Sequence, residues 1–464
     1  MVVQHNMQAA NASRMLGITT NAQSKSTEKL SSGFRINRAA DDAAGLSISE
    51  KMRKQIRGLD QASTNASDGI SAVQTAEGAL TEVHSMLQRM NELAVQAANG
   101  TNSESDRSSI QDEINQLTTE IDRVAETTKF NETYLLKGYN GDKTIRISAH
   151  DAGLEGVLSQ NTISGTFTMA KLEVGDTYKI GGTEYSIGAK DVTAATAALS
   201  YTNTSTGVIQ IDGKSWTLVG ESGTTNEELF QLKNSDISKY ATNGSTLEFN
   251  GKTVTIFSEA DKDDSTAYTD PNNKTLITST EAYNLIRNEL KAASTLGATT
   301  TEATVDAVEA VGTDKMKFVI HKGTATAKND LTFNLHVGSD ADMTNKIGVT
   351  IEAMTAKSLG LDGVSVNDAT GKSATYVIDS ISDALAKVSA QRSALGAVQN
   401  RLEHSIANLD NVVENTNAAE SRIRDTDMAD EMVTYSKNNI LAQAGQSMLA
   451  QANQATQGVM SLLQ

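Results

Sequence analysis

Histidines and carboxylates are the residues of this chain that could do chemistry, by binding a metal ion or by transferring protons. The six histidines are scattered, and no two have the spacing that places two ligands on one zinc ion. The chain has no Cys, which excludes thiolate metal sites and disulfides. We therefore expect no metal and no cofactor. The histidines are His5, His84, His150, His321, His336 and His404.

Two clusters of aspartates could in principle bind calcium. One is Asp41 with Asp42, and the other is Asp261, Asp263 and Asp264. Neither is followed by the Gly and Glu of an EF-hand loop, so we interpret both as solvated loops. The sequence also lacks a phosphate-binding loop, a dinucleotide fingerprint and a G-x-S-x-G nucleophile elbow. Without a catalytic constellation, we predict that the protein is not an enzyme.

The charge of the chain argues against nucleic acid and membranes as partners. The net charge is −17. Residues 1–137 hold 14 Lys/Arg against 17 Asp/Glu, and residues 355–464 hold 8 Lys/Arg against 12 Asp/Glu. The middle of the chain, between these segments, therefore carries −10. An acidic chain without a basic patch is a poor ligand for nucleic acid or anionic membranes. No stretch approaches the roughly 18 apolar residues of a membrane span. We interpret the acidic middle as a solvated surface, and the near-neutral ends as surfaces that pack against copies of the chain.

Both ends of the chain have the apolar spacing of long helices. The stretch NGTNS at 99–103 ends one stripe and starts the next, so those two helices should be antiparallel, the first about 48 Å long over roughly 32 residues. We predict a three-helix, coiled-coil-like bundle built from both halves of the sequence. Its stripes are Ala66, Ile70, Val73, Ala76, Leu80, Val83, Leu87, Met90, Ala94; Ile110, Ile114, Leu117, Ile121, Val124; and Ile381, Leu385, Val388, Leu395, Leu402, Ile406, Leu409, Val413.

The outermost segments, 1–40 and 425–464, are rich in Ala, Gln, Asn and Ser and have thin apolar stripes. Helices with so little apolar surface do not offset an ordering cost of about 1–2 kcal/mol per residue. We expect both segments to be disordered in the monomer and helical when neighbouring subunits cover them. The residues expected to make these assembly contacts are Leu30, Ile36, Ile440, Leu441, Met448, Val459 and Leu462.

The middle of the chain changes from helical to strand periodicity. Three hairpins are predicted at 178–185, 209–216 and 247–254, where Gly-Gly, Asp-Gly and Asn-Gly separate alternating strands. Short helices are expected at 226–233 and 280–293, and strands at 315–321, 331–337 and 347–354.

The predicted fold is therefore mainly α, a long antiparallel helical bundle from both termini, with an inserted β-rich or α+β central region in a multidomain chain. The expected domains are the N-terminal segment 1–40, bundle segment 41–137, a variable β-rich region 138–330, a strand segment 331–378, bundle segment 379–424 and the C-terminal segment 425–464.

Several blocks closely resemble bacterial flagellins. At the N-terminal end they are EKLSSGFRINRAADDAAG at 28–45, QAS at 61–63, NASDGIS at 65–71, QTAEGAL at 74–80 and LQRMNELA at 87–94. At the C-terminal end they are AESRIRDTD at 419–427, QAG at 443–445 and AQANQ at 450–454. The resemblance covers about 250 residues in collinear blocks, and leaves 138–330 uncovered.

The resemblance implies a flagellar filament subunit that serves motility and polymerises with itself. It further implies uncleaved export through the flagellar type III apparatus, an export chaperone on the C-terminal segment, and cap and hook-junction proteins as partners. The location would be extracellular. The absence of Cys and the single Pro271 suit a chain that crosses a narrow channel unfolded.

Flagellins are also ligands of a vertebrate Toll-like receptor. Carried over from the family's receptor-contact motif, the corresponding residues here are Arg89, Leu93 and Glu113. Arg89 and Leu93 are four positions apart and share a helix face, and Glu113 would lie on the antiparallel partner helix.

Two residues depart from the family pattern, which bears on local contacts and not on the family. Phe34 stands where the family usually has Leu, and Glu132 where it has Gly, so the turn after the second helix could differ.

The nearest alternative is a hook–filament junction protein, which shares the terminal helices but assembles in only a few copies. An enzyme inserted in a filament scaffold has no catalytic residues to support it, and a coiled-coil adhesin would carry a signal peptide.

Overall fold

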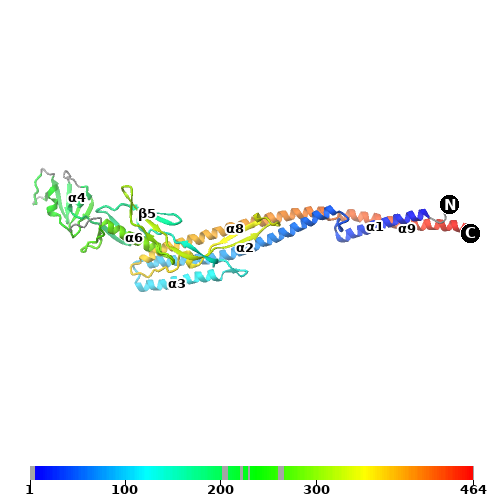
Figure 1. Cartoon of the computed structure of the whole chain (residues 1–464), viewed down its shortest axis with the longest axis horizontal. Helices are drawn as coiled ribbons and strands as arrows, with labels where there is room; N and C mark the ends of the chain where they lie inside the picture. The colour runs from blue at the N-terminus through cyan, green and yellow to red at the C-terminus, as the bar shows by residue number, and fades with distance from the viewer. Residues whose placement is uncertain (1–5, 201–206, 220–222, 228–229, 260–265, 463–464) are drawn as a thin grey trace. The chain divides into compact units, whose positions relative to one another are not determined.

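The computed structural model describes residues 6–200, 207–219, 223–227, 230–259 and 266–462. The chain forms two compact units. The first consists of Met1–Ser71, Phe333–Val349 and Ala397–Gln464, and the second of Ala72–Thr332 and Thr350–Gly396. Long helices come from both ends of the sequence and a β-rich region lies between them in the chain, which confirms the predicted fold class (Figure 1).

In the described part of the chain, five long helices come from the two ends of the sequence. They are α1 (Met7–Ser32), α2 (Ala43–Ala98), α3 (Glu104–Thr127), α8 (Lys372–Arg424) and α9 (Met428–Leu462). Between α2 and α3 the predicted stop and restart is confirmed. The Ser103 hydroxyl accepts a hydrogen bond from the Asp106 amide, and the Asp106 carboxylate accepts one from the Ser103 amide. This reciprocal cap starts α3 at the position that the sequence indicated.

The second unit contains the predicted three-helix packing. Stripe residues such as Leu87, Ile114 and Ile381 are buried on α2, α3 and α8. Two contacts per helix pair fix the directions. Arg89 of α2 lies 2.9 Å from Glu113 of α3, and Arg107 Nε of α3 donates to Ala97 O of α2. Arg392 of α8 lies 3.3 Å from Glu77 of α2, and a methyl group on Gly371, just before α8, would lie 3.3 Å from Ala98 O of α2. Both neighbours of α2 are antiparallel to it.

In the first unit a β-hairpin takes the place of the third helix. Strands β18 (Leu331–His336) and β19 (Lys346–Ile351) pair, and Leu335 and Ile347 pack with Ala66 of α2 and Leu402 of α8. A methyl group on Gly69 would lie 2.2 Å from Leu335 Cδ1, so any larger residue at this position would force the Leu335 side chain to move. The helical stripes thus continue along α2 and α8 although their partner changes.

The β-rich region is built around two cores in the second unit, one including Phe167 and Phe318 and the other Trp216 and Leu247. All three predicted hairpins are confirmed, as β6–β7, β8–β9 and β11–β12. The strand orders are β14-β16-β5-β4 with β15 on β16, β10-β9-β8-β11-β12, β13-β7-β6, β17-β3 and β1-β2.

The remaining elements are as follows. The strands are β1 (Lys129–Phe130), β2 (Thr133–Tyr134), β3 (Tyr139–Arg146), β4 (Val157–Gln160), β5 (Ser164–Ala170), β6 (Thr177–Ile180), β7 (Thr183–Ile187), β8 (Gly207–Ile211), β9 (Lys214–Val219), β10 (Gln231–Lys233), β11 (Thr246–Phe249), β12 (Lys252–Thr255), β13 (Leu276–Ile277), β14 (Thr304–Val305), β15 (Glu309–Val311), β16 (Lys315–His321) and β17 (Thr324–Asn329). The short helices are α4 (Val192–Ala198), α5 (Ile237–Tyr240), α6 (Ser279–Thr295) and α7 (Ala356–Leu359), with 3₁₀ turns η1 (Asn234–Asp236) and η2 (Met343–Asn345).

Two local predictions were wrong. The segment 226–233, where a helix was expected, contains strand β10, which runs parallel to β9; Phe230 has a φ of 51°, which no helix accommodates, and residues 228 and 229 lie outside the described part. The first bundle helix is 56 residues long, because α2 already begins at Ala43. The apolar side chains at its start, such as Leu46, Met52 and Ile56, are only half-buried.

The turn between β1 and β2 is strained at the residue that departs from the family pattern. Asn131 and Glu132 both have positive φ, 44° and 67°, as a two-residue type I′ hairpin turn requires. Asn tolerates this conformation, whereas Glu loses about 1–2 kcal/mol relative to glycine.

We expect Glu132→Gly to stabilise this hairpin by about 0.5–1 kcal/mol, after allowing for the extra freedom of glycine in the unfolded chain. The Leu135 amide, which donates to Thr128 O across the hairpin at 3.0 Å, should then exchange with solvent about threefold more slowly. Asn131→Gly is the matched control and should have less effect. Equal exchange in Glu132→Gly and the wild type would show that the turn is unstrained.

Candidate assembly surface

Helices α1 and α9 form an antiparallel pair in the first unit, here called the terminal helix pair. At one end Asn6 donates to Ala452 O at 3.0 Å, and at the other Lys29 pairs with Glu431 at 3.6 Å. Between them, a methyl group on Gly445 would lie 3.3 Å from Leu16 Cδ1. Figure 1 shows the two helices side by side. They have the helical spacing expected of the two chain ends.

The terminal helix pair buries almost nothing within its own chain. Among its described side chains only Ser26 and Ala442 are buried. Large apolar side chains lie exposed on both helices instead. On α1 they are Met7, Met15 and Ile18, and on α9 they are Met428, Met432, Val433, Ile440, Leu441 and Met448.

Part of this apolar surface lines a groove along the pair, with a volume of about 700 Å³. Met15 and Leu16 contribute from α1, and Leu441 and Met448 from α9, among Ala, Asn and Gln side chains. A contiguous apolar groove on an otherwise polar helix pair is typical of a protein–protein contact surface.

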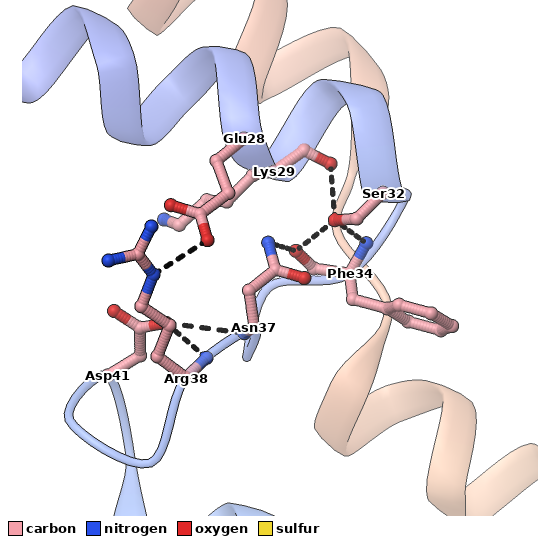
Figure 2. Close-up of polar contacts among 7 residues, drawn as sticks. All are labelled: Glu28, Lys29, Ser32, Phe34, Asn37, Arg38 and Asp41. Atoms are coloured by element: carbon pink, nitrogen blue, oxygen red, sulfur yellow. Dashed lines mark hydrogen bonds and ion pairs between the residues drawn. The ribbon is translucent and has the colours of Figure 1, made fainter.

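Residues 33–42, here called the connector, join α1 to α2 through a compact polar turn (Figure 2). The Asp41 carboxylate accepts hydrogen bonds from the amides of Arg38, at 2.9 Å, and Asn37, at 3.2 Å. These bonds, that from Arg38 foremost, lower the pKa of Asp41. Arg38 Nε in turn lies 2.8 Å from Glu28 of α1, so the connector is fixed to the helix it leaves.

The connector also pairs with the chain between α8 and α9. Phe34 forms an antiparallel bridge with Asp425; the Arg35 amide donates to Arg424 O at 2.6 Å, and the Thr426 amide to Gly33 O at 3.0 Å. In Figure 2 the Phe34 ring points away from the polar contacts. The Arg424 guanidinium covers it, 4.7 Å from the ring centroid.

Arg424 is the most connected side chain at this junction. Besides stacking on Phe34, it lies 2.9 Å from Glu50 of α2 and 3.9 Å from Glu420 of α8, and only 15% of its side chain is exposed. Its hydrogen bond lowers the pKa of Glu50. Arg424, near the end of α8, thus holds the connector and the start of α2 together with α8.

The start of α2 explains the DDAAG block at 41–45. Asp42 Oδ1 accepts the Gly45 amide at 2.8 Å and so caps the helix. A methyl group on Gly45 would lie 2.8 Å from Ile36 Cδ1, so the glycine makes room for Ile36, which is 2% exposed. The Asp41 and Asp42 carboxylates therefore have structural partners.

The structure distributes the predicted assembly residues over three environments. Ile440, Leu441 and Met448 are exposed on α9, at 67%, 47% and 60%. Leu30 is half-buried, and Ile36 is buried within its own chain, where it is closed to a neighbouring subunit. Val459 and Leu462 are helical positions of α9 whose side chains lie outside the described part.

The structure also brings two of the three predicted receptor residues together. Arg89 Nε lies 2.9 Å from Glu113 Oε1, its Nη1 lies 3.1 Å from Glu92, and both side chains of the Arg89–Glu113 pair are about half exposed. Leu93, by contrast, is 2% exposed. It is therefore a core residue of the bundle and is not on the surface.

Sequence reasoning missed the exposed residues of α1. Met7, Met15 and Ile18 stand at helical spacing, and this was the signal available for them. Arg424 was missed as well, because its partners are up to 390 positions away in the chain and no local pattern reveals them.

Other candidate chemistry finds little support in the described residues. They contain no group of three or more His, Asp or Glu side chains placed to hold a metal ion. The Asp261, Asp263 and Asp264 cluster and His5 lie outside the described part. Within that part, no helix is both long and apolar enough to cross a membrane.

The chain is similar to known proteins along its whole length. Residues 3–141 match the family profile described as the bacterial flagellin N-terminal helical region, and residues 378–463 match the bacterial flagellin C-terminal helical region. A flagellin of Clostridium tyrobutyricum is 39% identical, covering 98% of this chain and all of the relative.

Two further relatives give the same picture. Flagellin D of Vibrio cholerae is 35% identical over 99% of both chains, and a flagellin of Halalkalibacterium halodurans is 35% identical over 100% of both. The chain therefore belongs to the bacterial flagellin family, whose members are structural subunits of the flagellar filament.

Proposed function

We propose that this chain polymerises with itself through the terminal helix pair, forming an extracellular flagellar filament that serves motility. The observation that carries this proposal is the exposed apolar surface of α1 and α9, which have one buried described side chain each. Copies of the same chain are the occupants that family membership favours. On this account segments 1–40 and 425–464 are disordered in the monomer and become helical in the filament.

The free-energy cost of ordering α1 and α9 supports the proposal that contacts with neighbouring subunits stabilise these helices. Fixing one residue costs about 1–2 kcal/mol, and a helix outside a protein core is marginal in water. An apolar side chain such as Met448 or Ile440 contributes about 1.5–3 kcal/mol when it is fully buried. Neighbouring subunits must supply that burial, because α1 and α9 do not bury these side chains in one another.

Self-polymerisation of the purified protein tests this proposal against its alternative. Monomer mixed with short filament seeds should grow into long fibres that electron microscopy and light scattering detect. A hook–filament junction protein would stop at assemblies of a few copies. Growth limited to such rings or short stacks would reject the filament assignment.

The family also suggests how the subunit reaches its place. The proposed partners are an export chaperone on the C-terminal segment, and the cap and hook-junction proteins at the filament ends. The proposed route is uncleaved type III export. In support, α9 leaves its apolar side chains open for a chaperone, and the chain has no Cys and a single Pro.

A second proposed function is that of ligand for a vertebrate Toll-like receptor. The supporting observation is the exposed, ion-paired Arg89 and Glu113 on adjacent helices, which a receptor could contact directly. Leu93 would act from beneath, by holding α2 in place. Because Leu93 is buried, truncating it would cost about 2–5 kcal/mol of stability, which would confuse a binding result.

We expect Arg89→Asp to reduce receptor binding at least about tenfold, since it places a third carboxylate beside Glu113 and Glu92. The unfolding midpoint should change little, because exposed ion pairs contribute about 0–1 kcal/mol. Arg123→Asp is the matched control: Arg123 is also exposed and pairs with Glu120 on α3. Equal affinities of the Arg89 and Arg123 variants would remove Arg89 from the contact.

A further inference from the structure

Positive charge is concentrated on α2 soon after the connector, in a chain that is acidic overall. The segment KMRKQIR at 51–57 holds four Lys or Arg and no Asp or Glu, a local excess that the near-neutral total of residues 1–137 conceals. Arg53 pairs with Glu50 at 3.2 Å. The other three side chains are exposed, and among the described residues none of them has a hydrogen-bond or ion-pair partner; they are Lys51, Lys54 and Arg57.

These three side chains, here called the cationic face, point away from the core of the first unit. They follow one another in steps of three, so they are neighbours on the helix surface. At 3.6 residues per turn, Lys54 in the centre of the face lies about 140° around the helix from Leu59. Leu59 is the side chain that packs against Leu409 of α8. The cationic face is therefore free to contact another molecule.

Carboxylates of the same chain leave the cationic face unpaired. A methyl group on Gly58 would lie 3.1 Å from Ser339 Cβ, so the β18–β19 hairpin passes close to α2 at this level. Asp340 of that hairpin and Asp60 of α2 are both exposed. In the described structure neither carboxylate reaches ion-pair distance of the cationic face, so its charge is not neutralised within one copy.

A surface of opposite charge lies on α8 in the same unit. The segment EHSIANLDNVVE at 403–414 holds three carboxylates and no Lys or Arg. Glu403, Asp410 and Glu414 are seven and four positions apart, a spacing that places them on one side of the helix, and all three are exposed. Two of them accept hydrogen bonds from uncharged side chains, and no described cation lies within ion-pair distance. These three carboxylates are here called the acidic face.

We propose that the cationic face of one copy docks on the acidic face of a second copy, an inference that rests on the proposed self-polymerisation. Each copy presents one face of each sign, so a second copy supplies the complementary charge that the first one lacks. The cationic face spans roughly 9 Å of helix and the acidic face roughly 16 Å, so up to three ion pairs can form together. A polyanion such as nucleic acid is disfavoured, because the chain as a whole carries −17.

The two faces lie on different helices, and this determines the symmetry of the contact. A contact between two different surfaces is head-to-tail, and repeating it produces a ring or an open helical assembly instead of a closed dimer. Pairing of the cationic face with the acidic face therefore extends from copy to copy, as a filament requires.

Reversal of the cationic face tests the contact in the full-length chain. The variant with Lys51→Glu, Lys54→Glu and Arg57→Glu should raise the critical concentration for polymerisation at least about tenfold, because attraction to the acidic face becomes repulsion. The matched control changes the net charge equally at exposed, unpaired cations of the β-rich region and should keep the critical concentration of the wild type; it combines Lys190→Glu, Lys214→Glu and Lys274→Glu. Because all six side chains are exposed, the unfolding midpoint should change little in either variant.

Exchange of both faces shows whether they contact each other. Adding Glu403→Lys, Asp410→Lys and Glu414→Lys to the chain with the reversed cationic face restores opposite charges. The critical concentration should then return to within about threefold of the wild type. Raising NaCl from about 0.1 M to about 1 M shortens the Debye length from about 10 Å to about 3 Å, and should narrow the difference between the wild type and the cation-reversed variant.

Three results would overturn this docking while leaving the proposed filament function in place, provided that the wild type polymerises. They are an unchanged critical concentration after reversal of the cationic face, an equal shift in the control variant, and no recovery after exchange of both faces. A wild type that does not polymerise at all would overturn the proposed function, and the docking with it.

Discussion

Replacing Leu441 and Met448 together by Asp is expected to raise the monomer concentration needed for polymerisation at least about a hundredfold. Each side chain contributes at least about 1.5 kcal/mol when a neighbouring subunit buries it, and each 1.4 kcal/mol is a factor of ten. An unpaired carboxylate in that interface adds a further penalty. In the monomer both side chains are exposed, so the unfolding midpoint should stay the same.

The matched control is Val157→Asp with Ile163→Asp. These two side chains are 70% and 61% exposed, comparable with Leu441 and Met448, but lie at β4 and the turn after it. Sedimentation of filaments from monomer at increasing concentration measures the critical value for each variant. A similar shift in the control, or none in Leu441→Asp with Met448→Asp, would mean that this face of α9 is not an assembly contact.

Arg424→Ala is expected to slow filament growth about tenfold or more. The substitution removes the cover over Phe34 and leaves Glu50 and Glu420 without their cation, so the connector no longer fixes α1 to the end of α8. Arg424→Lys keeps the charge but loses the planar stacking and the forked set of N–H donors. Its rate of filament growth should lie between those of the wild type and Arg424→Ala. Seeded elongation measured by light scattering gives the rates.

A charge exchange separates this positioning role from a general loss of stability. Arg424→Glu with Glu50→Arg restores the ion pair and should recover part of the rate that Arg424→Glu alone loses. The pKa of Glu50 is lowered in the folded chain, so its contribution is complete above the ordinary Glu pKa of about 4.3 and is lost as pH falls through the lower folded value. No recovery in the exchanged variant would refute the role of the pair.

Local signals predicted much of the fold correctly. Capping and turn residues, which act over a few positions in the chain, predicted several elements. These are the helix start after 99–103, the three hairpin turns and helix α6. The helix predicted at 226–233 was wrong because tertiary contacts override the local helical preference. Leu232 is fully buried beside β9, and pairing with β9 makes this segment a strand. The β18–β19 hairpin on α2 depends on Gly69, whose role is visible only with Leu335 against it.

The sequence predicted the assembly surface of the terminal helix pair less well than it predicted the fold. Spacing placed Leu441 and Met448 on a helix. The residue type does not distinguish the exposed Met448 from the buried Ile36 or Leu93, because all three are large and apolar. Contacts between residues far apart in the chain decide burial. The disorder of 1–40 and 425–464 before assembly stays a prediction.

Hydrogen exchange compared between monomer and filament tests that prediction most directly. In the monomer the amides of α1 and α9 should exchange nearly as fast as in an unfolded peptide, while those of α2 between Val73 and Ala94 are protected. In the filament the amides of all three helices should be protected. Full protection of α1 and α9 in the monomer would show that the pair is complete without neighbours, and would contradict assembly through the terminal helices.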